Sequence, residues 1–190
     1  MLRSSASRLV PDEEFVIDTA RMRMIAAQLV HLRTELAEPT QLAALLGAEV
    51  PPSWPPGEYD RDAIAYFLSQ YEIRGPAAVG WYGWYAVCRV GEGSPAQLVG
   101  AGGYFGPPSH DGTVEIGYSI ADEARGEGYG SELALALTER ALRRPGVRRV
   151  IAHVAADNVA SHIVLKHAGF SFVAAGASGK LRYERVAKAR

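Results

Sequence analysis

The stretch at residues 120–131 restricts the fold of this 190-residue chain more than any other. It reads IADEARGEGYGS, in which a strand pattern ends, glycines alternate and a helical pattern begins. Gly126, Gly128 and Gly130 let backbone N–H groups approach a ligand without interference from a Cβ atom. The N-terminus of the following helix adds unpaired amides and a positive dipole end, and Arg125 adds a positive charge. The stretch predicts a phosphate-binding turn, although glycines that merely supply positive φ would give the same pattern.

The spacing of these glycines argues against two common nucleotide sites. A P-loop requires GxxxxGK[ST], which does not occur in the sequence. A dinucleotide-binding Rossmann motif requires GxGxxG near the start of a parallel βαβ unit. Here the glycines follow a GxGxG pattern, and they come after several predicted hairpins. ATP and NAD are therefore poor candidates for the ligand.

A second polar motif follows further along the chain. Asp157 or Asn158 can cap a short helix predicted over 158–167, and Ser161 lies one turn further on the side of Asn158. Gly169 fits the end of this helix, after which a strand begins with an apolar residue. A simple helix cap would explain this motif on its own, so its meaning depends on the glycine-rich turn that precedes it.

The rest of the chain shows patterns typical of an α+β protein. Strand patterns lie at 20–25, 80–89, 97–105, 113–120, 147–154, 170–175 and 181–186, and helical patterns lie at 28–47 (interrupted at 39–40), 60–73, 128–143 and 158–167. The proline-rich segment 50–57 fits neither pattern and predicts a stiff surface loop that carries Trp54. Hairpins followed by helix–strand alternation indicate an α+β fold with a mixed sheet.

Composition narrows the class of protein further. With 48% hydrophobic and 22% charged residues, the chain suits one core, so we expect one domain over 1–190. A net charge of −1 argues against a nucleic-acid partner held by bulk electrostatics. Cys88 has no partner for an internal disulfide, and we expect no metal site and no membrane association. These features predict a cytoplasmic protein.

The two motifs together resemble the acetyl-CoA signature of the GNAT acetyltransferase superfamily. The likeness runs over about 97–186 and consists of Arg125-x-x-Gly128-x-Gly130, a helix, a strand, Asn158-x-x-Ser161 and Gly169-Phe170. The first strand at 19–24, the sequence EIGY at 115–118 and the sequence NVAS at 158–161 are similar to one branch of the superfamily. That branch contains the ribosomal-protein N-terminal acetyltransferases (RimJ/RimL-like).

This resemblance implies a specific architecture. We expect a GNAT-like mixed, mostly antiparallel central sheet of about six to seven strands flanked by helices. The strands at 113–120 and 147–154 would splay apart and hold acetyl-CoA between them. Residues 97–175 would form the acetyl-CoA-binding core, 28–75 the substrate-side helices and loop, and 1–18 a loosely ordered N-terminal extension.

The resemblance also implies where the co-substrate acetyl-CoA binds. Its pantetheine amides would pair with the strand near Tyr118, and its pyrophosphate would lie on the glycine-rich turn. Asn158 would hydrogen-bond the pantetheine arm. The expected binding residues are Tyr118, Ser119, Ile120, Arg125, Gly126, Glu127, Gly128, Tyr129, Gly130, Ser131, Asn158 and Ser161.

Glu115 and Ser161 are the candidate catalytic residues. Strand alternation places Glu115 on the same face as Gly117 and Ser119, which leaves room for a substrate beside its carboxylate. Glu115 is expected to act as general base, directly or through water, although a glutamate that only keeps the sheet surface soluble would show the same pattern. Many members of the superfamily have a tyrosine where this sequence has Leu165. Ser161 is then left to hydrogen-bond the leaving thiolate, unless its hydroxyl only bonds the helix backbone.

Other conspicuous side chains have simpler explanations. Trp54 and Trp84 fit either the core or the wall of a cleft, and core packing is the simpler interpretation. The histidines near the second motif do not share one helical face, which argues against a metal site; they are His153, His162 and His167.

The expected activity is acetyl-CoA-dependent N-acetylation of a primary amine by direct attack in a ternary complex. The acceptor is either a protein N-terminal amine or a small molecule such as an amino sugar, a polyamine or an amino-acid derivative. A non-catalytic acyl-CoA-binding regulatory domain on the same fold is the third interpretation, and Glu115 and Asn158 argue against it. We expect no nucleic-acid or membrane partner, and either a monomer or a homodimer.

Overall fold

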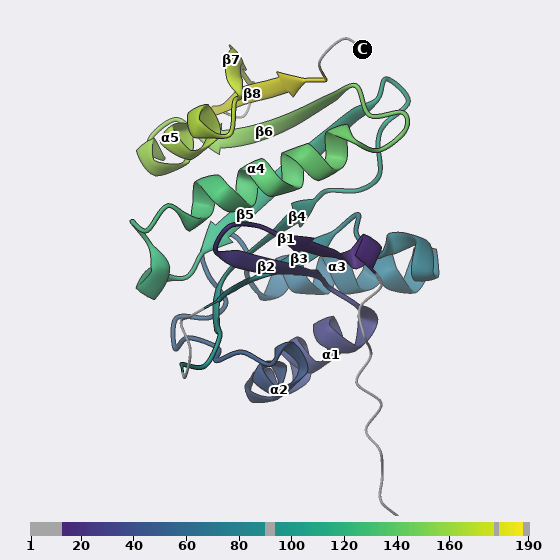
Figure 1. The fold of residues 1–190 in the computed structure, drawn as a ribbon. Helices are drawn as coiled ribbons and strands as arrows, with labels where there is room; N and C mark the ends of the chain where they lie inside the picture. Colours follow the sequence, from purple (N-terminus) through teal and green to yellow (C-terminus); the bar gives the residue numbers. More distant parts are fainter. Residues whose placement is uncertain (1–12, 90–93, 177–178, 188–190) are drawn as a thin grey trace, which may run out of the picture.

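The computed structural model describes residues 13–89, 94–176 and 179–187, which form one mixed sheet with helices on both faces (Figure 1). The strands are β1 (Val16–Asp18), β2 (Met22–Ala26), β3 (Gly83–Cys88), β4 (Gln97–Tyr104), β5 (Thr113–Ile120), β6 (Arg149–Ala155), β7 (Ser171–Ala175) and β8 (Lys180–Val186). The helices are α1 (Leu29–Ala37), α2 (Leu42–Leu46), α3 (Arg61–Arg74), α4 (Tyr129–Leu142) and α5 (Val159–His167), and short 3-10 turns lie at Glu13–Phe15, Pro39–Gln41, Gly75–Ala78 and Asp122–Ala124.

The strands follow the order β1-β2-β3-β4-β5-β6-β8-β7, and β5 with β6 is the parallel pair in an otherwise antiparallel sheet. The expected mixed and mostly antiparallel sheet is therefore confirmed, but it has eight strands rather than six to seven. The difference is β1, which pairs with β2 and places Val16 opposite Ile25. Residues 16–18 are therefore part of the sheet and not of a loosely ordered segment 1–18, while 1–12 lie outside the described residues.

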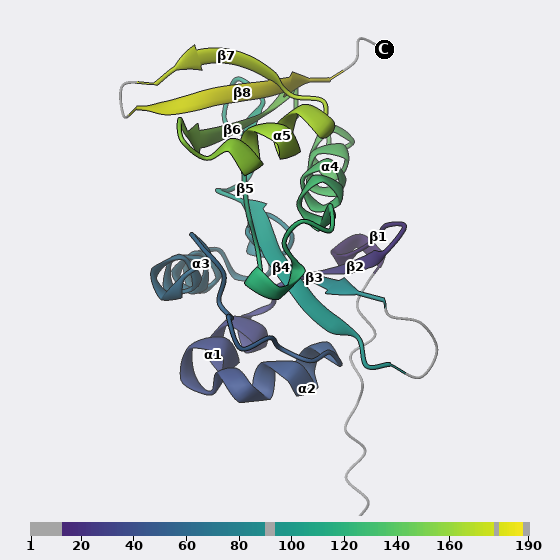
Figure 2. The same ribbon diagram turned by 90° about the vertical axis from the view of Figure 1, so that its left-hand side faces the viewer.

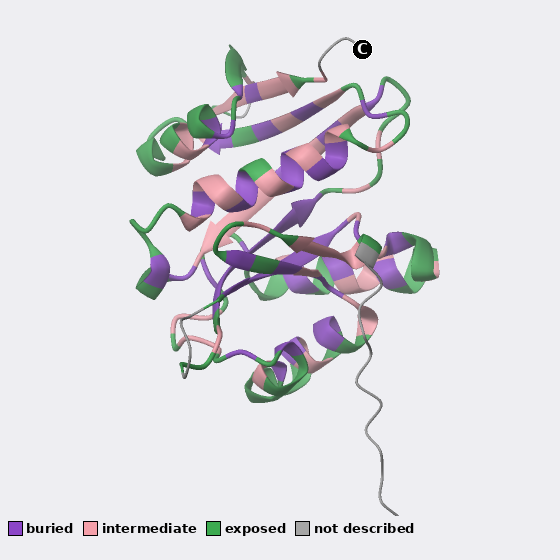
Figure 3. Cartoon of the chain, in the orientation of Figure 1, coloured by how far each residue is buried: buried purple, intermediate pink, exposed green. Residues whose placement is uncertain are grey.

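Two hydrophobic cores lie on opposite faces of the sheet (Figures 2 and 3). Helices α1 to α3 cover one face, and α4 and α5 cover the other. Strand alternation on β3 serves both cores, because Trp84 packs in the α4 core and Tyr85 packs in the α1–α3 core. Only 1% of Trp84 is exposed, so it belongs to the core and not to a cleft wall. Cys88 is also buried, as expected for a small core residue.

Capping residues explain why several helices begin and end close to the predicted positions. The Asp60 carboxylate accepts hydrogen bonds from the backbone N–H groups of Asp62 and Ala63 at 3.0 and 2.9 Å, which starts α3. Gly47 adopts a φ of 62° directly after α2, a left-handed conformation that ends the helix. None of the helices in the described part of the chain is both long and apolar enough to cross a membrane.

His31 makes the stability of the fold sensitive to acid. Its ring is buried near the start of α1, edge-on to the Tyr85 ring, and its Nδ1 accepts the backbone N–H of Gln28 at 3.0 Å. Burial lowers the pKa of His31 from 6.5 to about 4. Below pH 6.5 His31 is protonated in the unfolded chain, whereas in the folded chain it becomes protonated only near pH 4. The free energy of unfolding therefore falls as the pH drops through this window.

Between pH 7 and pH 4, we expect the free energy of unfolding to fall less in His31→Gln than in the wild type. The difference is roughly 3 kcal/mol, because each unit of pKa shift corresponds to about 1.4 kcal/mol. Urea unfolding at a series of pH values measures it. The exposed His110 provides the control, since His110→Gln is expected to follow the wild-type curve. Parallel curves for His31→Gln and the wild type would contradict this account of His31.

Candidate active site

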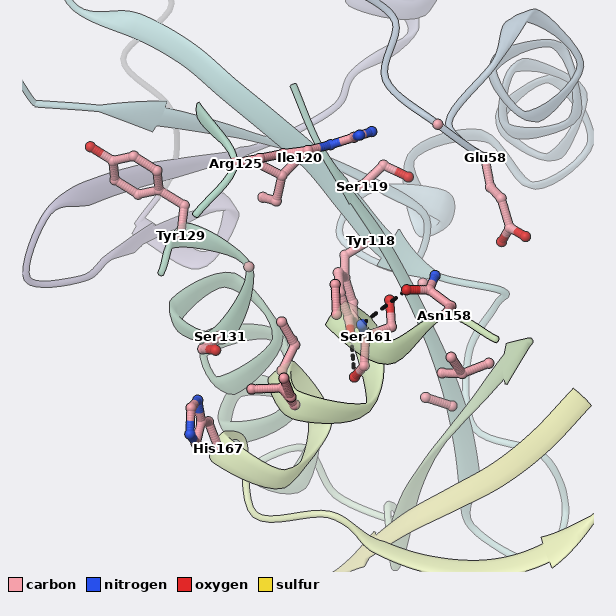
Figure 4. Close-up of a pocket in the computed structure, with 18 of the residues that line it drawn as sticks. Glu58, Tyr118, Ser119, Ile120, Arg125, Tyr129, Ser131, Asn158, Ser161 and His167 are labelled. Carbon is pink, nitrogen blue, oxygen red and sulfur yellow. Dashed lines mark hydrogen bonds between the residues drawn. The ribbon is translucent and has the colours of Figure 1, made fainter. Parts of the chain in front are cut away.

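The central feature of the site is a gap in the sheet between β5 and β6. The two strands pair only at their beginnings, where residues 113–115 lie opposite 149–151. Beyond that point the pairing ends, and a cavity of about 640 Å³ lies between the two strands (Figure 4). The gap lies between the strands that the resemblance predicts to splay apart.

The gap leaves part of the β5 backbone without a strand partner on one side. Backbone groups of Glu115 and Ala121 bond to Phe105 and Val99 on the β4 side, so the odd-numbered residues of β5 face β4. By alternation, the N–H and C=O groups of residues 116, 118 and 120 face the gap. An extended ligand that carries amides can pair with this edge as an added strand.

The glycine-rich turn closes one end of the cavity. Gly126 and Gly128 have φ angles of 83° and 81°, a backbone conformation that other residues rarely adopt, and α4 begins directly after Gly128. Gly130 serves helix packing instead, because a Cβ atom there would lie 3.3 Å from the side chain of Val164 on α5. The turn thus presents the first amides of α4 to the cavity, which is the geometry that favours an anionic group.

Arg21, in the turn just before β2, contacts the glycine-rich turn, a role that the sequence does not indicate. Its guanidinium donates to the carbonyl of Glu127 at 2.7 Å and to the Glu132 carboxylate at 2.8 Å. The same group lies over the Tyr129 ring, 4.5 Å from its centroid. Glu127 was expected to bind the co-substrate, but it is not among the residues that line the cavity, and its backbone carbonyl accepts the Arg21 guanidinium.

The start of α5 forms the opposite wall of the cavity (Figure 4). The Asn158 side chain accepts the backbone N–H of Ser161 at 3.1 Å and so caps the helix. The Tyr118 hydroxyl donates to the carbonyl of Ser161 at 3.4 Å, and burial raises the pKa of Tyr118 to about 12. Tyr118 therefore remains a neutral donor at physiological pH. Leu165 is fully buried in the core.

Apart from Glu127, the residues expected to bind acetyl-CoA all line this one cavity. They come from three segments of the chain: Tyr118, Ser119 and Ile120 on β5, Arg125, Gly126, Gly128, Tyr129, Gly130 and Ser131 at the turn and the start of α4, and Asn158 and Ser161 at the start of α5. An amide-rich turn, an unpaired strand edge and a capped helix fit the pyrophosphate and the amide-bearing arm of acetyl-CoA.

Glu115, the expected general base, lies just behind the cavity wall and not among its lining residues. Its carboxylate oxygen Oε1 is 2.7 Å from Nδ1 of His153 on β6, and His153 does line the cavity. The face that Glu115 shares with Gly117 is also partly covered, because a Cβ atom on Gly117 would lie 3.2 Å from the Phe105 ring. The contact with His153 depends on how the two strands diverge, so strand alternation alone does not reveal it.

The proline-rich loop covers the cavity on the α1–α3 face. Its last residue Gly57 and the adjacent Glu58 line the cavity, and a Cβ atom on Gly57 would lie 3.1 Å from the Ser119 hydroxyl. Ser53 bonds the Glu123 carboxylate through its backbone N–H at 3.2 Å, and Glu58 lies 3.6 Å from the Lys180 ammonium. This segment therefore makes polar contacts with residues on both sides of the gap.

A buried carboxylate holds the base of the same loop in place. Glu35 on α1 accepts hydrogen bonds from the Trp54 indole at 2.6 Å, the Tyr59 hydroxyl at 2.8 Å and the Tyr85 hydroxyl at 2.6 Å. Burial raises the pKa of Glu35, although its three donors favour the charged form. Trp54 thus packs against Tyr59 and Tyr85 and anchors the loop to the protein.

The sequence itself matches a known family. A family model described as "Acetyltransferase (GNAT) domain" matches residues 28–171. One curated relative is the Bacillus subtilis (strain 168) protein named "Uncharacterized N-acetyltransferase YjdG". It is 28% identical over 155 residues, which cover 82% of this chain and 89% of the relative.

Two solved structures of similar fold are named as acetyltransferases. RimL, a ribosomal L7/L12 alpha-N-protein acetyltransferase in complex with coenzyme A, superimposes with a TM-score of 0.62 at 18% identity and covers 90% of this chain and 97% of its own. A Salmonella typhimurium acetyltransferase that modifies the N-terminal serine of the 50S ribosomal protein L7/L12 gives 0.60 at 17% identity, covering 90% and 98%.

The fold likeness and the family match agree with the geometry of the gap. GNAT acetyltransferases use acetyl-CoA as the acetyl donor, and the RimL structure contains coenzyme A. Within the described ranges, no cluster of three or more His, Cys, Asp or Glu side chains is arranged to hold a metal ion. The cavity between β5 and β6, the glycine-rich turn and the matched segment 28–171 lead to one conclusion: this chain belongs to the GNAT family of acetyltransferases.

Proposed function

We propose that this chain transfers the acetyl group of acetyl-CoA to the N-terminal amine of a protein. The observation that carries the proposal is a cavity lined from both faces of the sheet. Gly128 and Ser131 line it on the α4 face, and Gly57 and Glu58 line it on the α1–α3 face. The donor would enter from the first face and the amine from the second, so that the two substrates meet in the gap between β5 and β6.

The α1–α3 face supports a polypeptide acceptor. The segment 53–58 contacts Glu123 on one side of the gap and Lys180 on the other. It thus borders an entrance that an extended chain terminus can enter. The Glu58 carboxylate lines this entrance and lies 3.6 Å from the Lys180 ammonium, so the entrance carries one charge of each sign. RimL and the Salmonella typhimurium enzyme of similar fold act on the N-terminus of L7/L12, which favours the same class of acceptor here.

The proposed reaction begins with loss of a proton from the acceptor ammonium to a base at the gap. The neutral nitrogen then attacks the carbonyl carbon of the thioester, the new C–N bond forms, and the C–S bond breaks. The N–H groups of residues 116, 118 and 120 face the gap, where one of them donates to the carbonyl oxygen as charge develops on it. Ser161 hydrogen-bonds the departing thiolate.

Release of free thiol from acetyl-CoA tests this proposal. The purified chain is incubated with acetyl-CoA and a panel of short peptides, amino sugars, polyamines and amino acids. We expect peptides with a free N-terminus to accelerate thiol release and to gain one acetyl group at that terminus by mass spectrometry. Peptides with a blocked N-terminus and an internal lysine serve as the matched control and should remain unmodified.

Two other outcomes are informative. Acceleration by small amines alone would overturn the polypeptide acceptor and leave the acetyltransferase activity in place. Tight binding of acetyl-CoA with no acceleration by any amine would overturn the catalytic proposal as a whole, and it would favour an acyl-CoA-binding regulatory domain on this fold.

A further inference from the structure

Glu115 and His153 form a side-chain pair at the point where β5 and β6 begin to diverge. The distance from Glu115 Oε1 to His153 Nδ1 is 2.7 Å, and each side chain is one-third exposed. Both side chains lie on the α1–α3 face of the sheet, because residues 150, 152 and 154 of β6 alternate with His153 and pack in the opposite core. The pair therefore lies on the face from which the proposed acceptor amine approaches.

The two members of the pair differ in their access to the cavity. His153 lines the cavity, whereas Glu115 does not. The two nitrogens of an imidazole lie on opposite edges of the ring, so Nε2 points away from the carboxylate that contacts Nδ1. Within residues 13–89, 94–176 and 179–187, Nε2 has no hydrogen-bond partner. A carboxylate at Nδ1 favours the tautomer that carries its proton there, which leaves the Nε2 lone pair free.

We propose that His153 takes the proton from the acceptor ammonium and that Glu115 is a positioning residue, which holds the ring and stabilises its charged form. The inference rests on the proposed acetyltransferase activity and assigns the proton transfer within it. It also explains why the carboxylate that the sequence singles out stands behind the cavity wall.

The proton balance of the reaction is complete with this assignment. Nε2 of His153 accepts one proton from the ammonium, and the neutral amine nitrogen forms the C–N bond. When the C–S bond breaks, the nitrogen loses its second proton to the thiolate, which leaves as coenzyme A. The imidazolium is stabilised by the Glu115 carboxylate until it returns its proton to solvent.

The charged groups around His153 come from three other segments. Arg182 on β8 is its antiparallel partner, and Glu184 and Lys180 lie on the same face of β8 as Arg182. The Arg182 guanidinium lies 3.5 Å from the Glu184 carboxylate, and Lys180 lies 3.6 Å from Glu58. Both cations near His153 are therefore paired with a carboxylate, while Glu115 on β5 directly contacts the ring.

The pH dependence of kcat/KM separates the roles of the two residues. We expect His153→Gln to lower kcat/KM by about 100-fold and to abolish the acidic limb of its pH profile. Glu115→Gln is expected to lower kcat/KM by about tenfold and to retain the limb, because His153 is still present to take the proton. The double variant should resemble His153→Gln alone, since the two residues act as a unit.

Matched controls keep these results interpretable. His110→Gln makes the same replacement at an exposed loop position and should retain the wild-type profile. Acetyl-CoA affinity and urea unfolding of each variant report whether the fold and the donor site persist. A wild-type acidic limb in His153→Gln, or its loss in Glu115→Gln alone, would overturn the assignment while the activity stands. If the wild-type chain itself shows no amine-dependent thiol release, the proposed function fails instead.

Discussion

Replacing Gly128 by valine is expected to weaken acetyl-CoA binding about tenfold or more while the fold persists. Gly128 has a φ of 81°, and a β-branched residue is strongly disfavoured in this left-handed conformation. A Cβ atom there would also lie 3.4 Å from the Arg21 guanidinium, which braces the turn through Glu127. The turn would therefore rearrange and move the first amides of α4 away from the pyrophosphate. Isothermal titration calorimetry with acetyl-CoA measures the loss.

Gly146 offers a matched control beyond the opposite end of α4. It has a φ of 83°, and a Cβ atom there would meet no atom within 4 Å. Gly146→Val imposes the same kind of backbone strain far from the cavity, so it should reduce stability without changing affinity. Equal losses of acetyl-CoA affinity in the two variants would show that the glycine-rich turn has no special role in binding.

Gly103→Ala is expected to have the largest effect on stability. A Cβ atom at this position of β4 would lie 1.8 Å from the carbonyl oxygen of Tyr82 and 3.2 Å from the Cα atom of Gly83. These are backbone atoms next to or within β3, so no side-chain rotation relieves the clash, and the two strands must separate. We expect the free energy of unfolding to fall by about 4 kcal/mol or more, a large part of the stability of a typical domain. Urea unfolding, or loss of soluble protein, measures it.

Gly117→Ala on the neighbouring strand isolates the role of the backbone clash. There the nearest atoms belong to the Phe105 ring at 3.2 Å, and Phe105 is 54% exposed and free to move. We expect this variant to change the free energy of unfolding by about 1 kcal/mol or less. Similar losses in Gly103→Ala and Gly117→Ala would contradict the close approach of β3 and β4 described for Gly103.

The parts of the site that depend on short stretches of sequence could be predicted. The strand at 113–120 matches β5 in both bounds, and the glycine-rich turn and the Asn158 cap lie where their local patterns indicate. Each of these features is determined by neighbouring residues, through alternation, positive φ or helix capping. The cofactor-binding residues are concentrated in such segments, so most of them could be named before the structure.

The contacts that join distant segments could not be predicted in this way. Arg21, which directly precedes β2, contacts the turn from more than a hundred residues earlier in the chain. The Glu115–His153 pair depends on the register and divergence of β5 and β6, which neither strand encodes alone. Similarly, the sequence around Glu35 indicates only a glutamate on a helix. Its hydrogen-bond donors Trp54 and Tyr59 come from a later loop, and the sequence does not show that this loop packs against α1.

The most direct test of the account is a titration of the ¹⁵N-labelled chain with acetyl-CoA, followed by amide NMR. We predict that the largest shifts occur at Tyr118 and Ile120 on the free edge of β5 and at Gly126 to Ser131 on the turn. A separate cavity, between α1 and the 3-10 turn Gly75–Ala78, is lined by Gln28, Val30 and Thr34 among others and provides the internal comparison. Shifts confined to that cavity, with β5 and the turn unaffected, would contradict the binding of acetyl-CoA between β5 and β6.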